Sequence, residues 1–287
     1  MPEHPSPAFD LLVCPLCGQD LAARDRALRC PGGHTFDLAR QGYVNLLPGD
    51  ARPGTADTAD MVAARHAFLA AGSYAPLTRA VAEAAAEHAG GAAAVLDAGA
   101  GTGHYLAAVL DALPGAVGLA LDLSKFALRR AARSHQRAAA AVWDVWQPLP
   151  VRSGSVDVLL DVFAPRNAAE FHRVLRPGGL LLVVTPGPGH LAELREAAGL
   201  LAVDADKEER LERTLGGFFR AGRTVPLDHP MSLDPARAAA AVAMGPSAHH
   251  AARLPAVDGS GEPVRVTASF RLSFHRPLPA PPAGPRR

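Results

Sequence analysis

The chain has 287 residues, of which 48% are hydrophobic and 20% are charged, and its formal net charge at pH 7 is +1. This composition is that of an ordinary soluble protein with one large core and a small additional module, and it excludes a surface that is basic overall. No apolar run approaches the ~20 residues of a membrane-spanning helix, and the N-terminal residues lack the pattern of a secretory signal, so we expect a cytoplasmic protein without a membrane partner.

Three cysteines and a histidine near the N-terminus predict a metal site. Cys14 and Cys17 form a Cys-x2-Cys pair, and Cys30 and His34 form a Cys-x3-His pair twelve residues later. Three thiolates and one imidazole make the tetrahedral set of structural zinc and leave no position open for water. The alternatives are a disulfide with one free thiol or a redox Cys-x-x-Cys, and an intracellular setting disfavours both. A polar, turn-rich segment, residues 49–59, then predicts a linker.

Two helices are expected next, over Met61–Leu69 and Tyr74–His88, from the spacing of their apolar residues. Gly72 and Ser73 separate them, which places Tyr74 at a helix start. There it is either a core aromatic or a residue that contacts a ligand.

The most informative motif is VLDAGAGTG, residues 95–103. A buried strand is expected to end there, and Gly99, Gly101 and Gly103 predict a sharp turn whose backbone approaches a ligand. The spacing differs from the G-x-G-x-x-G of dinucleotide oxidoreductases. The next predicted strand ends in Asp122, where a carboxylate can hold a ribose diol. Together these features resemble the S-adenosylmethionine site of a class I methyltransferase; the alternative is a glycine-rich turn in an unrelated α/β protein.

Apolar segments that alternate with helical ones predict five parallel strands. They are Ala93–Ala98, Val117–Asp122, Ala139–Trp143, Val156–Val162 and Leu180–Thr185. Alternating residues in Val264–Phe274 predict an antiparallel pairing with a strand near Phe219–Leu227. We therefore expect an α/β fold, with a Rossmann-like, mostly parallel seven-stranded sheet covered on both faces and a ligand crevice at the carboxyl ends of its strands.

A row of basic residues follows Asp122. Four of them recur every four positions and one lies beside the row, which predicts a ridge along one helix. They are Lys125, Arg129, Arg133, Arg137 and Arg130. Such a ridge either follows a phosphate backbone or is a solvated helix face.

Longer runs carry a family resemblance. They are HTFDLARQGYVNLLP (34–48), DMVAARHAFLAAGSYAPL (60–77), VLDAGAGTGHYL (95–106), LDLSKFALRRAAR (121–133), DVFAPRN (161–167), VLRPGGLLLVVTPGPGHLAEL (174–194) and AMGPSAH (243–249). The chain resembles the RlmA family of bacterial 23S rRNA guanine-N1-methyltransferases, and FAPRN and AMGPS are closest to its tylosin-resistance branch. The resemblance implies methylation of guanine N1 in a domain II hairpin of 23S rRNA near the peptide exit tunnel. It also implies a homodimer and favours resistance to tylosin-type macrolides as the physiological role, with a housekeeping methyltransferase as the alternative.

Five residues of the glycine turn and its neighbouring strand are the first candidates for cofactor binding. Gly99, Gly101 and Thr102 lie where backbone groups approach the methionine part of S-adenosylmethionine. Asp97 is expected to anchor the turn or the amino group of the cofactor, and Asp122 to accept hydrogen bonds from the ribose hydroxyls.

Further candidates come from the other strand ends and from the resemblance. Asp144, after the third parallel strand, is placed to contact the adenine edge. The family's counterparts of Tyr74 and His190 contact the cofactor. Guanine N1 carries a proton at neutral pH, so a proton acceptor is expected, and Asp161 is the carboxylate nearest to the expected methyl position; it is otherwise a residue that caps its turn. Phe163 is placed to stack on the base, which must be flipped out or unpaired.

Two further features concern the substrate. The carbonyls of Ala164 and Pro165 are placed to accept hydrogen bonds from the guanine amino group. After AMGPS, relatives carry an aromatic residue where this chain has His249 beside His250, and histidine stacks on a base more weakly.

The sequence thus predicts a zinc-containing, S-adenosylmethionine-dependent RNA methyltransferase. Residues 1–48 form a zinc-binding, RNA-recognition module, residues 49–59 a linker, residues 60–277 the methyltransferase domain and residues 278–287 a Pro-rich tail. The alternatives are a methyltransferase for a small molecule, which needs no zinc module, and a non-catalytic rRNA-binding factor, which the intact glycine turn and Asp122 disfavour.

Overall fold

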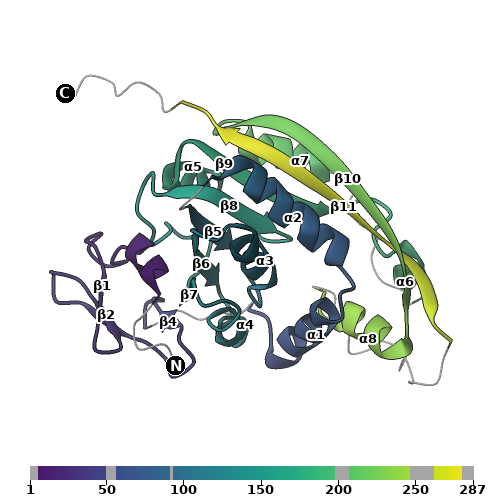
Figure 1. The fold of residues 1–287 in the computed structure, drawn as a ribbon, viewed down its shortest axis with the longest axis horizontal. Coiled ribbons are helices and arrows are strands. Elements are labelled where there is room, and N and C mark those ends of the chain that lie inside the picture. The colour runs from purple at the N-terminus through teal and green to yellow at the C-terminus, as the bar shows by residue number, and fades with distance from the viewer. Residues whose placement is uncertain (1–5, 50–55, 91–92, 198–206, 246–261, 280–287) are drawn as a thin grey trace.

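A computed structural model describes residues 6–49, 56–90, 93–197, 207–245 and 262–279 of the chain. The N-terminal part is a short 3-10 helix, η1 (Pro7–Leu11), and a three-stranded antiparallel sheet of β1 (Ala22–Arg24), β2 (Ala27–Arg29) and β3 (Thr35–Asp37). This small sheet lies at one end of the molecule (Figure 1). Strands of three residues bury little surface, so a metal is the expected source of its stability.

The main sheet has eight strands in the order β10-β11-β9-β8-β5-β6-β7-β4. The bounds are β4 (Val44–Asn45), β5 (Ala94–Ala98), β6 (Val117–Asp122), β7 (Ala138–Val142), β8 (Val156–Val162), β9 (Leu175–Pro186), β10 (Phe219–Leu233) and β11 (Val264–Pro277). Strands β4 to β9 pair in parallel, and β11 pairs antiparallel with both β9 and β10. The expected sheet is confirmed, including the antiparallel closing pair, and β4 is added to it.

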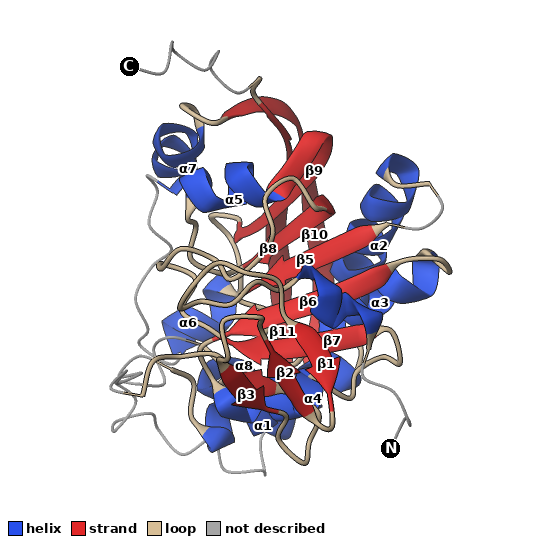
Figure 2. Cartoon of the chain, turned by 90° about the vertical axis from the view of Figure 1, so that its left-hand side faces the viewer, coloured by secondary structure: helices blue, strands red, loops and turns tan. Residues whose placement is uncertain are grey.

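Helices cover both faces of this sheet, as expected. The bounds are α1 (Ala59–Ala70), α2 (Ala75–His88), α3 (His104–Ala112), α4 (Lys125–Ala131), α5 (Ala168–Val174), α6 (Ala192–Ala197), α7 (Lys207–Leu215) and α8 (Pro235–Ala243). Helices α2 and α3 lie on one side of the strands and α5 and α7 on the other (Figure 2). Alternate strand residues divide between the two cores: Val95 packs in the α2–α3 core and Leu96 in the opposite one. None of the helices in the described ranges is long and apolar enough for a membrane span.

The N-terminal module is continuous with the main sheet. Strand β4 follows the module in sequence and pairs in parallel with β7. The N–H of Val13 donates to Pro150 O at 2.9 Å, and the N–H of Arg152 donates to Leu11 O at 3.0 Å. Leu12 and Val44 are fully buried in the same core as the sheet residues. Residues 50–55 of the expected linker and 280–287 of the expected tail lie outside the described residues.

The predicted basic ridge on one long helix is wrong. Helix α4 ends at Ala131, because local side chains take over the hydrogen bonds that would continue it. Ser134 Oγ donates to Ala131 O at 2.9 Å, and the N–H of Arg137 donates to His135 Nδ1 at 3.0 Å. The guanidinium of Arg137 turns inward and donates to the carbonyls of Leu110, Leu113 and Ala116. Arg137 is therefore a structural residue and does not extend a basic stripe.

Candidate active site and metal centre

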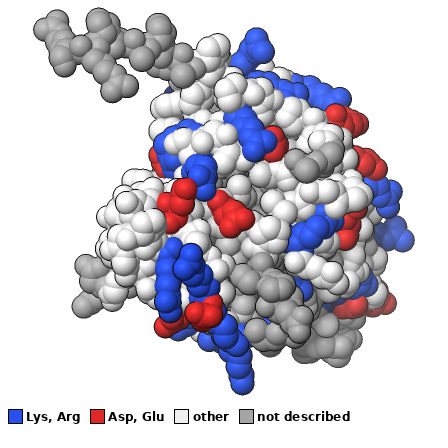
Figure 3. Space-filling view, turned by 60° about the vertical axis from the view of Figure 1, so that its left-hand side comes forward, with Lys and Arg blue, Asp and Glu red and all other residues white. Residues whose placement is uncertain are grey.

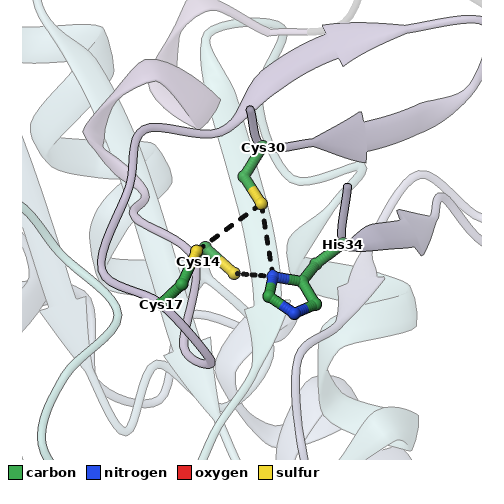
Figure 4. Close-up of side chains that lie close together, drawn as sticks. All are labelled: Cys14, Cys17, Cys30 and His34. Carbon is green, nitrogen blue, oxygen red and sulfur yellow. Dashed lines mark hydrogen bonds between the residues drawn. The ribbon is translucent and has the colours of Figure 1, made fainter. Parts of the chain in front are cut away.

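The four expected metal ligands converge in the N-terminal module (Figure 4). His34 Nδ1 lies 3.5 Å from Cys14 Sγ and 3.4 Å from Cys30 Sγ, and Cys17 Sγ lies 3.6 Å from Cys30 Sγ. Ligand atoms around a tetrahedral Zn²⁺, with bonds of about 2.0–2.3 Å, are separated by about 3.4–3.8 Å. All three cysteines are free, and the sulfur separation excludes a disulfide between Cys17 and Cys30. The residues present therefore fit a closed structural zinc site.

Two tight turns bring these ligands together. The first turn closes with a hydrogen bond from the N–H of Gly18 to Cys14 O, and the second with one from the N–H of Gly33 to Cys30 O. Both glycines have positive φ, of 72° and 85°, which other residues adopt only with strain. Burial opposes ionisation of Cys30, but hydrogen bonds from His34 and the neighbouring thiols outweigh it and lower the pKa of Cys30 to about 6. The thiolate is the form that binds a metal, so the lowered pKa suits Cys30 to a ligand role.

The glycine turn connects β5 to α3 and forms the floor of the second candidate site. Gly99, Gly101 and Gly103 all have positive φ. A Cβ at Gly99 would lie under 3.0 Å from the side chain of Ala164, so the loop after β8 rests directly on the turn. Thr102 is buried within the same turn. The chain therefore needs glycine at position 99 both for its backbone conformation and for this close approach.

Asp122 holds the turn in place from the end of β6. Its Oδ2 accepts from the N–H of Gly101 at 2.8 Å, and its Oδ1 accepts from the N–H of Ser124 at 2.7 Å. Burial raises the pKa of this carboxyl, and these two hydrogen bonds oppose that effect. Asp122 thus fixes the turn in addition to its expected contact with a ribose.

Asp97 is a buried carboxyl group without a hydrogen-bond partner. It is 1% exposed, and neither carboxyl oxygen has a partner among the described residues; the Tyr105 hydroxyl nearby has none either. Burial, and then the charge of Asp122, raise the pKa of Asp97 to about 8. Buried polar groups are nearly always hydrogen-bonded, so two such groups beside a glycine turn indicate a site for a ligand with donors. The α-ammonium of S-adenosylmethionine has that chemistry, and the residues present fit this cofactor.

Tyr74 and His190 meet across the site, although 116 positions separate them in sequence. The Tyr74 oxygen lies 3.1 Å from His190 Nε2, and the N–H of Ser269 donates to His190 Nδ1 at 3.2 Å. The ring that accepts at Nδ1 carries its proton at Nε2 and donates to the tyrosine oxygen. The Phe270 ring packs 4.8 Å from Tyr74 and 4.9 Å from His190, so these side chains form an aromatic wall.

Phe163 continues this aromatic wall toward solvent. Its ring centroid lies 5.8 Å from that of Phe270, and the side chain is 43% exposed. Its φ is +57°, a conformation that costs a bulky residue about 1–2 kcal/mol. Strain of this kind collects at functional sites. Phe163 is therefore the described aromatic of this wall that is placed to meet a ligand from outside.

Sequence reasoning missed Arg65. Its guanidinium lies over the glycine turn, 3.6 Å from the position of a Cβ on Gly101. It forms an ion pair with Asp57 and donates to Met244 O at 2.8 Å, which joins the linker, the turn and the end of α8. A single arginine on an amphipathic helix gives no signal of this placement in the sequence; the only hint is that the DMVAARHAF run belongs to the family resemblance.

The remaining candidates lie at the carboxyl ends of β8 and β7. Asp161 is fully buried, belongs to the side of β8 that faces the α5 core, and lies 3.2 Å from Arg166 Nε. Burial raises the pKa of Asp161, the charge of Arg166 opposes that effect, and the charge of nearby Asp97 adds to it. Asp144 follows β7, and its Oδ1 accepts from the N–H of Trp146 at 3.0 Å. His249 and His250 lie outside the described residues.

A Rossmann-like sheet with a glycine turn after its first strand and an acid after the second defines a class I S-adenosylmethionine-dependent methyltransferase, here joined to a zinc ribbon. A family model for the N-terminal region of RlmA matches residues 12–52, and a methyltransferase-domain model matches residues 95–179. A protein of Micromonospora griseorubida that bears the provisional name 23S rRNA (guanine-N(1)-)-methyltransferase is 54% identical over 93% of this chain and 97% of the relative. The 23S rRNA (guanine(748)-N(1))-methyltransferase of Streptomyces fradiae is 51% identical over the same shares. The chain belongs to the RlmA family of 23S rRNA (guanine-N1)-methyltransferases.

Proposed function

We propose that this protein methylates N1 of a guanine in a domain II hairpin of 23S rRNA, near the peptide exit tunnel. The single observation that carries the proposal is the 51% identity to the Streptomyces fradiae enzyme over 97% of its length, whose name gives the acceptor as N1 of guanine 748. The FAPRN and AMGPS runs favour the branch that confers resistance to tylosin-type macrolides. We also propose a cytoplasmic homodimer, as the resemblance implies.

The same proposal assigns different roles to the N-terminal module and to the methyltransferase domain. Residues 1–48 bind the RNA hairpin, and residues 49–59 are the linker between this module and the methyltransferase domain. Residues 60–277 catalyse the methyl transfer, and residues 278–287 are a tail. The metal is structural, because all four of its positions are taken by side chains. Basic and acidic side chains alternate on the face turned forward in Figure 3, so recognition by the shape of the hairpin suits this surface better than broad electrostatic attraction.

The cofactor-binding residues are proposed as follows. Asp97 accepts from the amino group of the cofactor, and the backbone at Gly99, Gly101 and Thr102 lines its methionine part. Asp122 accepts from the ribose hydroxyls. Asp144 contacts the adenine edge, while Tyr74 and His190 form the wall beside the reacting group. When bound, S-adenosylmethionine supplies a methyl group on a positively charged sulfonium.

The protein then has to orient a guanine and remove one proton from it. The ring is unpaired or flipped out before attack, because N1 lies on the Watson–Crick edge. Phe163 stacks on the ring, and the carbonyls of Ala164 and Pro165 accept from its amino group. Asp161 is the proposed acceptor of the N1 proton, because it lies at the end of the strand that leads into the Phe163 loop and the charge of Arg166 favours its ionised, proton-accepting form. Positioning of this kind can contribute several kcal/mol to the rate.

Primer extension across the domain II hairpin tests the function. Methylation at N1 blocks Watson–Crick pairing, so reverse transcriptase should stop one nucleotide before the modified guanine, only when S-adenosylmethionine is present. No stop despite cofactor binding would favour a small-molecule acceptor, and no cofactor binding would favour a non-catalytic rRNA-binding factor. Asp161→Asn should bind cofactor normally and lose turnover; unchanged turnover would mean that Asp161 is not the proton acceptor.

A further inference from the structure

Four large apolar side chains are more than a third exposed among the described residues: Leu16, Trp146, Phe163 and Phe218. Trp146 has the highest value, 63%, and Leu16 follows at 61%. Tryptophan is usually largely buried, because its ring offers much apolar surface. An indole left in solvent therefore needs a reason.

The backbone that presents Trp146 is held firmly. Its N–H donates to Asp144 Oδ1 at 3.0 Å, and its carbonyl accepts from Asn167 Nδ2 at 3.2 Å. The same Asn167 amide also donates to Val145 O at 3.1 Å. Asn167 caps α5 as well, where its Oδ1 accepts from the N–H of Glu170. The start of a helix thus fixes the loop on both sides of the indole.

The next residues of the loop are fixed from the same helix. The N–H of Leu149 donates to Glu170 Oε2 at 2.6 Å. Arg173 donates to the carbonyls of Leu149 and Val151, both at 2.8 Å, and forms an ion pair with Glu170 at 2.7 Å. An aromatic ring on a loop fixed in this way loses little conformational entropy when a ligand packs on it.

Trp146 is also close to both functional parts, through its own chain segment and through Asn167. A groove of about 540 Å³ separates the zinc module from the methyltransferase domain, and its walls include Leu16, Pro148 and Arg152. Trp146 is two residues from Pro148 in sequence. On the other side, Asn167 joins its loop to the segment that begins with Phe163. Trp146 is thus linked through Pro148 to the groove beside the zinc module and through Asn167 to the segment of the proposed target-base site.

We propose that Trp146 is a stacking platform for an unpaired RNA base next to the target guanine. This inference rests on the proposed function. Asp144 and Asn167 hydrogen-bond to the Trp146 backbone and Gln147 follows it, so polar groups flank the indole, whereas a protein partner's anchor needs a desolvated pocket. A base needs only the face of the ring, and base–aromatic stacking does not depend on which base is present.

Tryptophan fluorescence tests this contact directly, because the chain has two tryptophans and Trp143 is only 6% exposed. In a Trp143→Phe protein, the remaining signal comes from Trp146, and titration with the domain II hairpin should quench it strongly. The reverse variant, Trp146→Phe, keeps only the buried indole and should show little quenching. If the Trp143→Phe protein does not fold, the loss of quenching in Trp146→Phe relative to the unmodified chain gives the same answer.

Affinity provides the second readout. Trp146→Ala should weaken binding of the hairpin about 5- to 100-fold, the range typical of one stacked base, while Trp146→Phe should restore most of it. Affinity for S-adenosylmethionine should stay unchanged in both variants. Phe218→Ala, an exposed aromatic beside edge strand β10, is the matched control and should bind RNA normally.

The outcomes separate the two proposals. If the unmodified protein methylates the hairpin but Trp146→Ala binds it as tightly and no quenching occurs, the stacking platform is refuted and the proposed function stands. If the unmodified protein neither binds nor methylates the hairpin, the proposed function fails and the platform fails with it. Weaker binding in Phe218→Ala of the same size would show a general effect of exposed aromatics and would also refute the assignment.

Discussion

Replacing Gly99 with alanine should damage this protein in two separable ways. The φ of Gly99 is +81°, and left-handed backbone costs an L-residue about 1–2 kcal/mol. In addition, the new Cβ would lie under 3.0 Å from the side chain of Ala164. Forcing an extra carbon into packed structure costs typically about 1–3 kcal/mol. We therefore expect Gly99→Ala to lower the free energy of unfolding by about 2–5 kcal/mol.

Gly154 is the matched control for the backbone effect. Its φ is +58°, and a Cβ there would meet no atom within 4 Å. Gly154→Ala should therefore lose only the backbone contribution, about 1–2 kcal/mol. Urea unfolding of both variants with zinc bound measures the difference, which is the cost of the clash with Ala164.

The clash also has a functional consequence, because Ala164 follows Phe163 directly. Gly99→Ala should push the loop after β8 away from the turn and reduce methylation at least tenfold, whereas Gly154→Ala should keep activity near that of the unmodified protein. Equal losses of stability in the two variants, together with unchanged methylation in Gly99→Ala, would refute the close approach of turn and loop.

Three further predictions follow from the two sites. The pKa of Asp97 is about 8 in the folded protein without cofactor and about 4 in the unfolded chain, so the free energy of unfolding should fall by about 1.4 kcal/mol per pH unit as pH rises between these values. Urea unfolding of Asp97→Asn at several pH values should lack this contribution to the slope. An unchanged slope would contradict the raised pKa of Asp97. Arg65→Ala should weaken binding of S-adenosylmethionine about tenfold by calorimetry, because the guanidinium offsets the negative charge of Asp122 and connects the turn to Met244. The control Arg79→Ala, on the exposed side of α2, should bind the cofactor normally. Equal affinities of the two variants would show that Arg65 has no part in the site. Cys17→Ser should reduce the zinc content below one per chain and lower the midpoint of thermal unfolding by several degrees, because the module shares a core with the sheet. Full zinc content by elemental analysis would show that Cys17 is not a ligand. Thr35→Ala in the same module is the control.

Features determined by short sequence spacings could be predicted, and features determined by tertiary contacts could not. The Cys3His cluster and the glycine turn are local patterns, and in the structure their residues form the metal-ligand cluster and the turn that the spacing predicts. Arg137 shows the opposite case: its spacing suggested an exposed ridge, but three carbonyls of another segment accept its hydrogen bonds. Arg65 and Tyr105 likewise acquire their positions only when distant elements pack. Strand β4 has two residues, which is too short for any periodicity to reveal.

Strand β4 has a consequence for the solubility of the protein. The residues of β7, Ala138–Val142, are all apolar, and β4 pairs with the last two of them, so the loss of β4 would lengthen the bare edge that β7 presents to other chains. Bare edges of this kind nucleate aggregation. Residues 60–277 produced alone should therefore tend to precipitate. A shortage of zinc should act in the same direction, so metal supply would govern the solubility of the whole enzyme.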